Sequence, residues 1–169
     1  MTLDMDGDRF YKTAEKLLFN QKLDLPLPSE KSRFSMNSST AEALTMQTGI
    51  GQGNTLVTPI HMAMIVSAIA NDGKLMKPYL VDSVVSADGN KVKTNSPVTY
   101  QQLLSSSDAE LLTGLMKGVV ENGTAKSLKG LGVEIAGKTG SAEHGDGSQQ
   151  AHSWFVGFSN PDAPEIVVS

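Results

Sequence analysis

The segment from Pro59 to Ala70 constrains the fold most, because it is a helix-length run that is apolar on nearly every face. Thr58 suits its N-terminus, since a threonine side chain can cap the first free N–H groups, and proline fits the first turn. Asn71-Asp72-Gly73 ends the run with a glycine where the chain must turn. A helix without a polar face is normally buried. The sequence therefore requires other layers packed around this helix.

Two more helices are predicted from apolar residues at helical spacing. The first runs from Arg9 to Asn20. The second is opened by a capping box of Ser107 and Glu110 and is stopped by Asn122-Gly123. The prolines of the segment 23–30 predict an extended surface loop, which the polar stretch 31–40 continues.

Strands are predicted in two parts of the chain. Asp88-Gly89-Asn90 is a hairpin signal between the segments 81–87 and 91–93. Toward the C-terminus, strand candidates follow one another across short loops at 133–141, 153–159 and 166–169. Such an order favours antiparallel pairing. The predicted fold class is α+β, an antiparallel sheet with packed helices.

Composition excludes several function classes. The 169 residues have a net charge of −4 and no basic cluster, which argues against a nucleic-acid partner. The chain has no cysteine, so disulfides, thiol catalysis and cysteine-rich zinc sites are ruled out. No apolar run approaches the roughly 18 residues of a membrane span. Residues 1–6 lack the pattern of a signal peptide.

The C-terminal residues Glu165 to Ser169 begin a β-branched run that stops at once. This pattern is typical of a strand interrupted part-way. We therefore expect residues 1–169 to be a fragment of one domain, truncated at both ends, with any targeting segment outside it.

Lys138-Thr139-Gly140-Ser141, at the end of a predicted strand, is the main candidate site. The motif combines a cation with two hydroxyl side chains, and its glycine leaves room for a ligand backbone. An edge strand of this kind can pair with an extended peptide and bind its carboxylate. On its own the motif is short, and a solvated strand end is the alternative interpretation.

Four other motifs accompany this strand in order. They are Gly51-Gln52-Gly53, Thr58-Pro59, Gly123-Thr124-Ala125 and the segment 154–158, which reads Trp-Phe-Val-Gly-Phe. Together with the Lys-Thr-Gly strand they resemble the penicillin-binding proteins, in particular the C-terminal half of the class B (monofunctional) transpeptidase domain. The resemblance extends over essentially the whole chain, and it implies the β-lactamase/transpeptidase-like fold.

The resemblance also implies a chemistry. In this family an active-site serine attacks a D-alanyl-D-alanine stem peptide, peptidoglycan becomes cross-linked, and β-lactam antibiotics trap the serine. Lys138 would supply positive potential, and the hydroxyls of Thr139 and Ser141 would bind the terminal carboxylate. The N–H of Ser141 would be one oxyanion-hole donor, and Gly140 would keep the strand open. No cofactor is implied, and the parent protein would be membrane-anchored with this domain outside the cytoplasm.

The chain departs from the family pattern at the nucleophile. No serine is followed by a lysine three residues later anywhere in the 169 residues. Ser35-Met36-Asn37 matches the middle Ser-x-Asn motif in letters, but it follows the 9–20 helix, whereas the family motif precedes the corresponding helix. Without a nucleophile and its base, covalent catalysis has no first step, so we expect this chain alone to be inactive.

Other interpretations stay open. A serine β-lactamase or β-lactam sensor has the same fold, and a short non-catalytic module could bind peptide carboxylates. His144, Asp146 and His152 are interpreted as part of a flexible loop and not as a metal site, because no further close ligand accompanies them. His61, on the buried helix, is interpreted as a core residue. Exposure of the core face that a missing half would cover predicts self-association.

Overall fold

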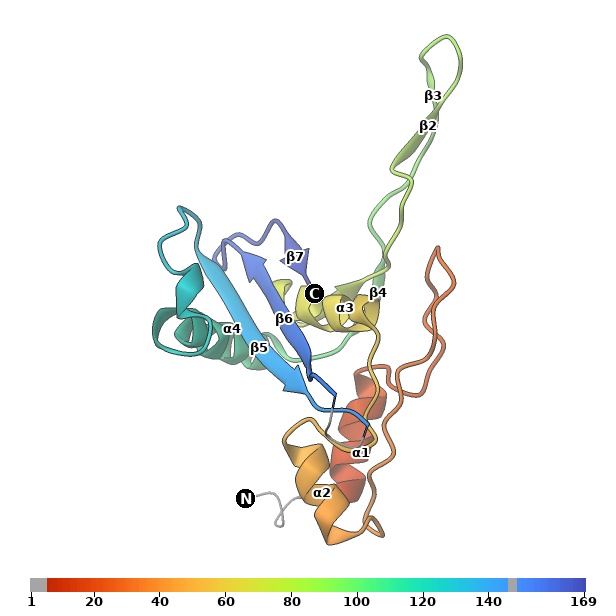
Figure 1. The fold of residues 1–169 in the computed structure, drawn as a ribbon. Coiled ribbons are helices and arrows are strands. Elements are labelled where there is room, and N and C mark those ends of the chain that lie inside the picture. The colour runs from red at the N-terminus through yellow and green to blue at the C-terminus, as the bar shows by residue number, and fades with distance from the viewer. Residues whose placement is uncertain (1–5, 146–148) are drawn as a thin grey trace.

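The computed structural model describes residues 6–145 and 149–169 (Figure 1). In chain order the elements are α1 (Gly7–Lys16), α2 (Glu42–Gly49), α3 (Pro59–Ala70), β1 (Lys74–Met76), β2 (Ser83–Val85), β3 (Lys91–Thr94), β4 (Thr99–Gln102), α4 (Ser106–Asn122), the 3₁₀ turn η2 (Lys126–Leu128), β5 (Ile135–Ala142), β6 (His152–Ser159) and β7 (Val167–Val168). The strands pair as β1–β4, β2–β3 and β5–β6–β7, and every pair is antiparallel. The predicted α+β class is confirmed.

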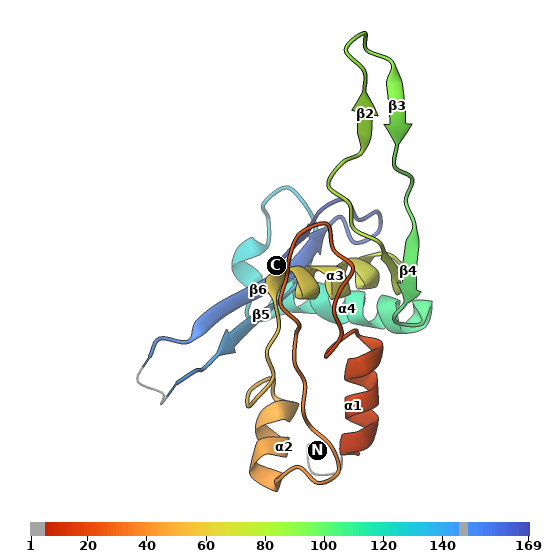
Figure 2. The same cartoon turned by 90° about the vertical axis from the view of Figure 1, so that its right-hand side faces the viewer.

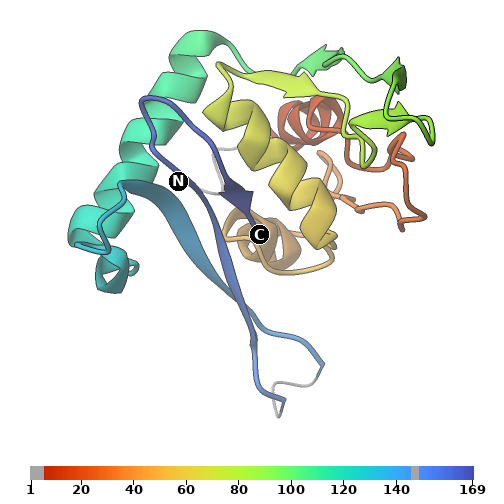
Figure 3. The same cartoon turned by 90° about the horizontal axis from the view of Figure 1, so that it is seen from above.

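The three-stranded sheet β5–β6–β7 has α3 and α4 packed on one of its faces (Figure 3). Val66 of α3 and Met116 of α4 form a buried cluster with Ala136 of β5 and Phe158 of β6. Within the described residues no helix covers the opposite face, which is turned toward the viewer in Figure 1. Because successive side chains of a strand point to opposite faces of the sheet, every second residue points toward α3 and α4. The others point to the opposite face, called the open face below.

The central position predicted for the 59–70 helix is confirmed. Besides its contact with the sheet, α3 contributes Met64 and Ala68 to a second buried cluster, formed with residues from other parts of the chain. The Thr58 hydroxyl accepts a hydrogen bond from the His61 N–H at 3.3 Å, so threonine is the cap. Gly73 has a φ of +78°, a left-handed conformation that favours glycine.

The N-terminal part packs through an aromatic group. Phe34 contacts the rings of Phe10 and Phe19, with centroids 5.1 Å and 6.1 Å away. Phe34 lies in the segment that was predicted to be a polar loop, and this prediction is partly wrong. Its neighbours Ser32 and Met36 are also buried, so the segment alternates inward and outward like a strand, although only Arg33 forms a β-bridge.

Some boundaries also differ from prediction. The helix predicted to reach Asn20 ends at Lys16, because Leu18 and Asn20 adopt left-handed backbone angles of +70° and +63°. The capping box on Ser107 is wrong: Ser105 is the N-cap of α4, and its hydroxyl accepts from the Asp108 N–H at 3.1 Å. The elements α2, β1 and β4 were not predicted.

The hairpin β2–β3 projects away from the rest of the molecule as a two-stranded arm (Figure 2). The turn predicted at Asp88-Gly89-Asn90 lies at its tip, with Gly89 at a φ of +84°. Among the described residues, no helix has the length and apolar character needed to cross a membrane.

Candidate functional site

The motif Lys138-Thr139-Gly140-Ser141 lies in β5, where it makes up the fourth to seventh of the eight residues, so the predicted strand is confirmed. β5 pairs with β6 through residues 135–142 in one uninterrupted register, in which Ser141 lies opposite Ser153. In the order β5–β6–β7, β5 has a neighbour on one side only. Its other edge is therefore free among the described residues.

Two side-chain contacts show which backbone groups face this free edge. The Lys138 ammonium donates to the Thr139 carbonyl at 2.6 Å, and the Gln52 side-chain amide donates to the Ser141 carbonyl at 3.0 Å. In an antiparallel ladder the N–H and C=O of one residue point to the same side, and this side alternates along the strand. The N–H groups of Thr139 and Ser141 consequently also face the free edge.

Glycines bring β5 and β6 into close contact. A Cβ on Gly137 would lie 2.5 Å from the tip of the Phe155 ring, and one on Gly157 would lie 2.6 Å from the Ala136 carbonyl oxygen. The Phe155 ring thus lies across two opposed glycines on the open face. At Gly140 a Cβ would lie 3.3 Å from the Cβ of Trp154, so this glycine also eases cross-strand packing.

Gln52 comes from a turn shaped by two glycines. Gly51 and Gly53 have φ angles of +82° and +75°, and a Cβ on Gly53 would lie 2.9 Å from Leu44. The Gln52 N–H returns to the Gln47 carbonyl of α2 at 2.9 Å. This geometry explains the Gly-Gln-Gly motif: it directs one amide side chain to β5. The Gly-Gln-Gly motif was recognised in the sequence, but its contact with Ser141 was not predicted.

Thr124 approaches β5 from the turn after α4. Its hydroxyl oxygen lies 2.5 Å from that of Thr139. The Gly123-Thr124-Ala125 motif was likewise recognised in the sequence without a role. Both motifs therefore converge on the same four residues of β5, which sequence spacing alone could not show.

Two histidines lie at the end of the β5–β6 ladder, where His144 follows β5 and His152 begins β6. The rings of His144 and His152 are stacked with centroids 4.1 Å apart and an interplanar angle of 19°. The Nε2 atom of His144 lies 3.0 Å from the Gln150 carbonyl oxygen. Asp146 lies outside the described residues. Within residues 6–145 and 149–169, no group of three or more potential metal ligands gathers.

Two other residues considered from the sequence lie elsewhere. His61 is buried, its Nε2 atom is 2.7 Å from the Leu17 carbonyl oxygen, and burial lowers the pKa of its imidazole. In Ser35-Met36-Asn37, Met36 is buried, and the Asn37 side chain accepts hydrogen bonds from the backbone and hydroxyl of Ser39. These contacts give His61 and Asn37 structural roles.

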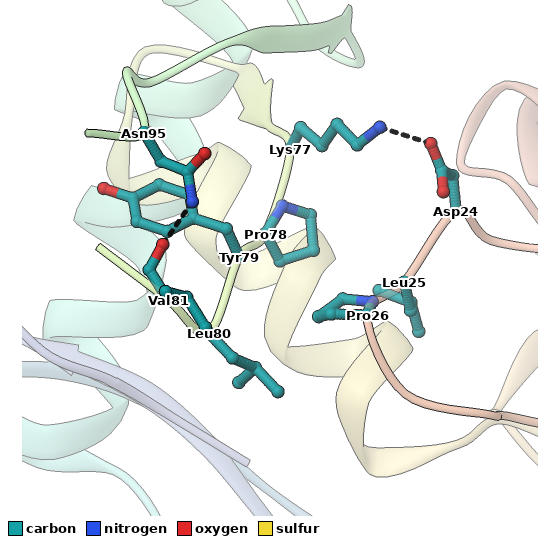
Figure 4. Close-up of a pocket in the computed structure, with 9 residues that line it drawn as sticks. All are labelled: Asp24, Leu25, Pro26, Lys77, Pro78, Tyr79, Leu80, Val81 and Asn95. Atoms are coloured by element: carbon teal, nitrogen blue, oxygen red, sulfur yellow. Dashed lines mark hydrogen bonds and ion pairs between the residues drawn. The ribbon is translucent and has the colours of Figure 1, made fainter. Parts of the chain in front are cut away.

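A hollow of about 400 Å³ lies at the base of the β2–β3 arm (Figure 4). It is lined by Asp24, Leu25, Pro26, Lys77, Pro78, Tyr79, Leu80, Val81 and Asn95. Lys77 and Asp24 form an ion pair of 2.5 Å beside it, and this pair raises the pKa of Lys77. None of the lining residues belongs to β5, so the hollow is separate from the strand motif.

The whole chain, residues 1–169, matches the model of the penicillin binding protein transpeptidase domain. A peptidoglycan D,D-transpeptidase PbpA of Mycolicibacterium smegmatis is 34% identical over 153 residues, which are 87% of this chain and 31% of that protein. The chain thus spans about a third of this relative's length.

Solved structures of penicillin-binding proteins are also similar to this chain. The crystal structure of PBPA from Mycobacterium tuberculosis is 31% identical, with a TM-score of 0.81 over 92% of this chain and 37% of that chain. An imipenem acyl-enzyme complex of penicillin-binding protein A from M. tuberculosis is 32% identical, with a TM-score of 0.80 over 92% of this chain and 35% of that one.

Proposed function

Because the chain belongs to the penicillin-binding protein transpeptidase family, we propose that it is the substrate-binding part of a peptidoglycan D,D-transpeptidase. The whole enzyme cross-links stem peptides by serine acyl transfer and reacts with β-lactams. In support, relatives are named as D,D-transpeptidases, and one related structure is an acyl-enzyme with a β-lactam.

The observation that carries this proposal is the free edge of β5. It presents the N–H and C=O groups of Thr139 and Ser141 beside the lysine cation and two hydroxyls. An incoming peptide pairs with this edge as an added strand. Its C-terminal carboxylate accepts hydrogen bonds from the two hydroxyls, and Lys138 supplies a compensating positive charge.

The same edge serves the acyl transfer. As the serine oxygen attacks the carbonyl carbon, negative charge develops on the carbonyl oxygen of the peptide. The Ser141 N–H donates a hydrogen bond to this oxygen, and one such donor lowers the barrier by about 3 kcal/mol. Gly140, next to Ser141, has no side chain that could hinder the peptide at this edge of the strand.

The nucleophilic serine and its lysine base belong to sequence outside these 169 residues, since the chain has no Ser-x-x-Lys. The chain is accordingly a fragment of one domain of a longer protein, which is anchored in the cytoplasmic membrane and acts outside it. The separate fragment is inactive and self-associates through the apolar surface that the rest of the domain would cover.

Nuclear magnetic resonance can test the carboxylate site on this chain. N-acetyl-D-alanyl-D-alanine should shift the amide signals of residues 138–141, whereas N-acetyl-D-alanyl ethylamide, which has no carboxylate, should shift them far less. Lys138→Met should weaken binding of the first ligand. Lys129→Met, which removes an exposed lysine outside β5, is the matched control and should leave it unchanged.

Equal responses to the two ligands, or no response to either, would contradict the carboxylate site. A separate measurement tests the missing nucleophile. A fluorescent penicillin should leave the chain unlabelled after denaturing electrophoresis, because no activated serine is present to form the acyl bond. Stable labelling would place the nucleophile within the 169 residues.

A further inference from the structure

The turn after α4 fixes the position of one hydroxyl group. Gly123 and Ala125 both return their N–H groups to the Val119 carbonyl, at 3.0 Å and 3.2 Å, and Ala125 is buried. A Cβ on Gly123 would lie 2.9 Å from the Val119 carbonyl oxygen, so only glycine allows so close a turn. Thr124 is therefore held between two anchored neighbours.

The Thr124 hydroxyl is directed at the strand. Its oxygen lies 2.5 Å from the Thr139 hydroxyl oxygen, and either atom could donate the proton by geometry alone. Each hydroxyl has a single proton and can also accept hydrogen bonds. Thr139 can therefore donate to Thr124 or to a ligand, but not to both.

A carboxylate resolves this choice, because its oxygens only accept hydrogen bonds. If Thr139 gives its proton to a bound carboxylate, Thr124 must be the donor in the contact between the two threonines. Hydrogen bonds in such a chain polarise one another, so the bond that reaches the charged group is strengthened. The contact then acts on the ligand through Thr139.

We propose that Thr124 is a positioning residue that donates its hydroxyl proton to Thr139 and so directs the proton of Thr139 to the ligand carboxylate. This inference rests on the proposed function, in which β5 binds that carboxylate. It gives the Gly-Thr-Ala motif a role in recognition that acts through Thr139.

A purely structural role for Thr124 is the rival explanation, and the two differ in their dependence on the ligand. If Thr124 only tethers the turn to β5, its loss should affect every ligand of the strand alike. If it orients the Thr139 proton, its loss should affect ligands with a carboxylate and spare those without one.

The experiment measures dissociation constants by NMR titration of the full 169-residue chain with N-acetyl-D-alanyl-D-alanine and N-acetyl-D-alanyl ethylamide. Thr124→Val keeps the branched shape without the hydroxyl, and Thr124→Ser keeps the hydroxyl. We expect the valine variant to bind the carboxylate ligand roughly threefold to tenfold more weakly, the effect of one net hydrogen bond. The serine variant should bind like the wild type, and ethylamide binding should be the same in all three.

The outcomes separate the two proposals. If the wild type does not prefer the carboxylate ligand, the proposed function fails and this inference fails with it. If the wild type prefers it and Thr124→Val keeps the full preference, only the role of Thr124 is overturned. Equal weakening for both ligands also overturns it, in favour of the structural tether. Thr124→Ala replaces the valine variant if the spectrum of the latter shows loss of the fold.

Discussion

The side-chain amide of Gln52 donates a hydrogen bond to the carbonyl oxygen of Ser141 at 3.0 Å, although 89 positions separate the two residues. The contact joins the turn before α3 to the last part of β5. It lies on the strand's free edge, where the strand has no backbone partner among the described residues. Gln52 therefore secures the end of the strand that β6 holds from one side only.

Removal of the Gln52 side chain should loosen this end of β5. Gln52→Ala should lower the free energy of unfolding by about 0.5–1.5 kcal/mol, the net value of one hydrogen bond. Amide hydrogen exchange should become faster at Ala142, which pairs with His152 at the end of the ladder. It should change little at Ala136, near the other end.

A matched control exists elsewhere in the chain. The Gln101 side-chain amide donates to the Lys16 carbonyl at 3.2 Å, far from β5 in the sequence. Gln101→Ala should therefore leave the exchange rate of Ala142 unchanged. Equal protection of Ala142 in the wild type and in Gln52→Ala would show that the contact does not secure the strand.

The close approach of β5 and β6 predicts different effects for three glycine substitutions. Gly157→Ala should be the most destabilising, because the new methyl group would meet the Ala136 carbonyl oxygen at 2.6 Å, a backbone atom held in the ladder. Gly137→Ala should cost about 1–3 kcal/mol, since the atom it meets belongs to the movable ring of Phe155.

The control for these substitutions is Gly118, in the interior of α4. A Cβ there would have no neighbour within 4 Å. Gly118→Ala should therefore stabilise the chain by about 0.5–1 kcal/mol through helix propensity alone. Thermal and urea unfolding measure all three changes, and a Gly157→Ala variant as stable as the wild type would disprove the close packing.

The fold was predictable wherever local chemistry decides the structure. Thr58 caps α3 and Gly89 turns the hairpin as predicted, because a cap and a tight turn depend on a few adjacent residues. Prediction failed most clearly where distant contacts decide the structure, whereas the N-cap of α4 was misplaced by two positions within a run of three serines. The segment around Phe34 looked polar, but tertiary packing buries every second residue, and sequence spacing does not show this.

The candidate site shows the same limit. The sequence identified the strand with Lys138, and the structure places it on a sheet edge. The contacts of Gln52 and Thr124 could not be predicted from spacing, because each joins segments that only the folded chain brings together. The glycines next to Gln52 and Thr124 were the local indication that the backbone turns in a specific way at these two positions.

Burial of His61 should make stability depend on pH. Burial lowers the pKa of this imidazole below its ordinary value of 6.5, so between the two pKa values the unfolded chain binds more protons than the folded one. The free energy of unfolding therefore rises with pH in this interval. The contribution should be complete above pH 6.5 and should be lost as the pH falls through the lowered pKa.

His61→Gln is the variant that isolates this effect. Glutamine keeps an amide donor for the Leu17 carbonyl, which the histidine Nε2 contacts at 2.7 Å, but it has no group that titrates. The variant should be less stable overall, yet its urea unfolding should vary less between pH 5 and 7 than that of the wild type. His144 and His152 are present in both proteins and cancel from the comparison. An unchanged pH profile in the variant would disprove this assignment.

Besides the surface that the rest of the domain would cover, the exposed side of α4 should contribute to self-association. Leu111 and Leu115 are 63% and 60% exposed, and their spacing places them on one face of the helix. A second copy of the chain can cover this apolar pair. We therefore expect the molar mass from light scattering to rise with protein concentration, and the double variant Leu111→Gln, Leu115→Gln to shift it toward the monomer. Val92→Thr, which changes a residue of the arm that is 69% exposed, should leave the mass unchanged. A wild type that stays monomeric at every concentration would contradict self-association through this surface.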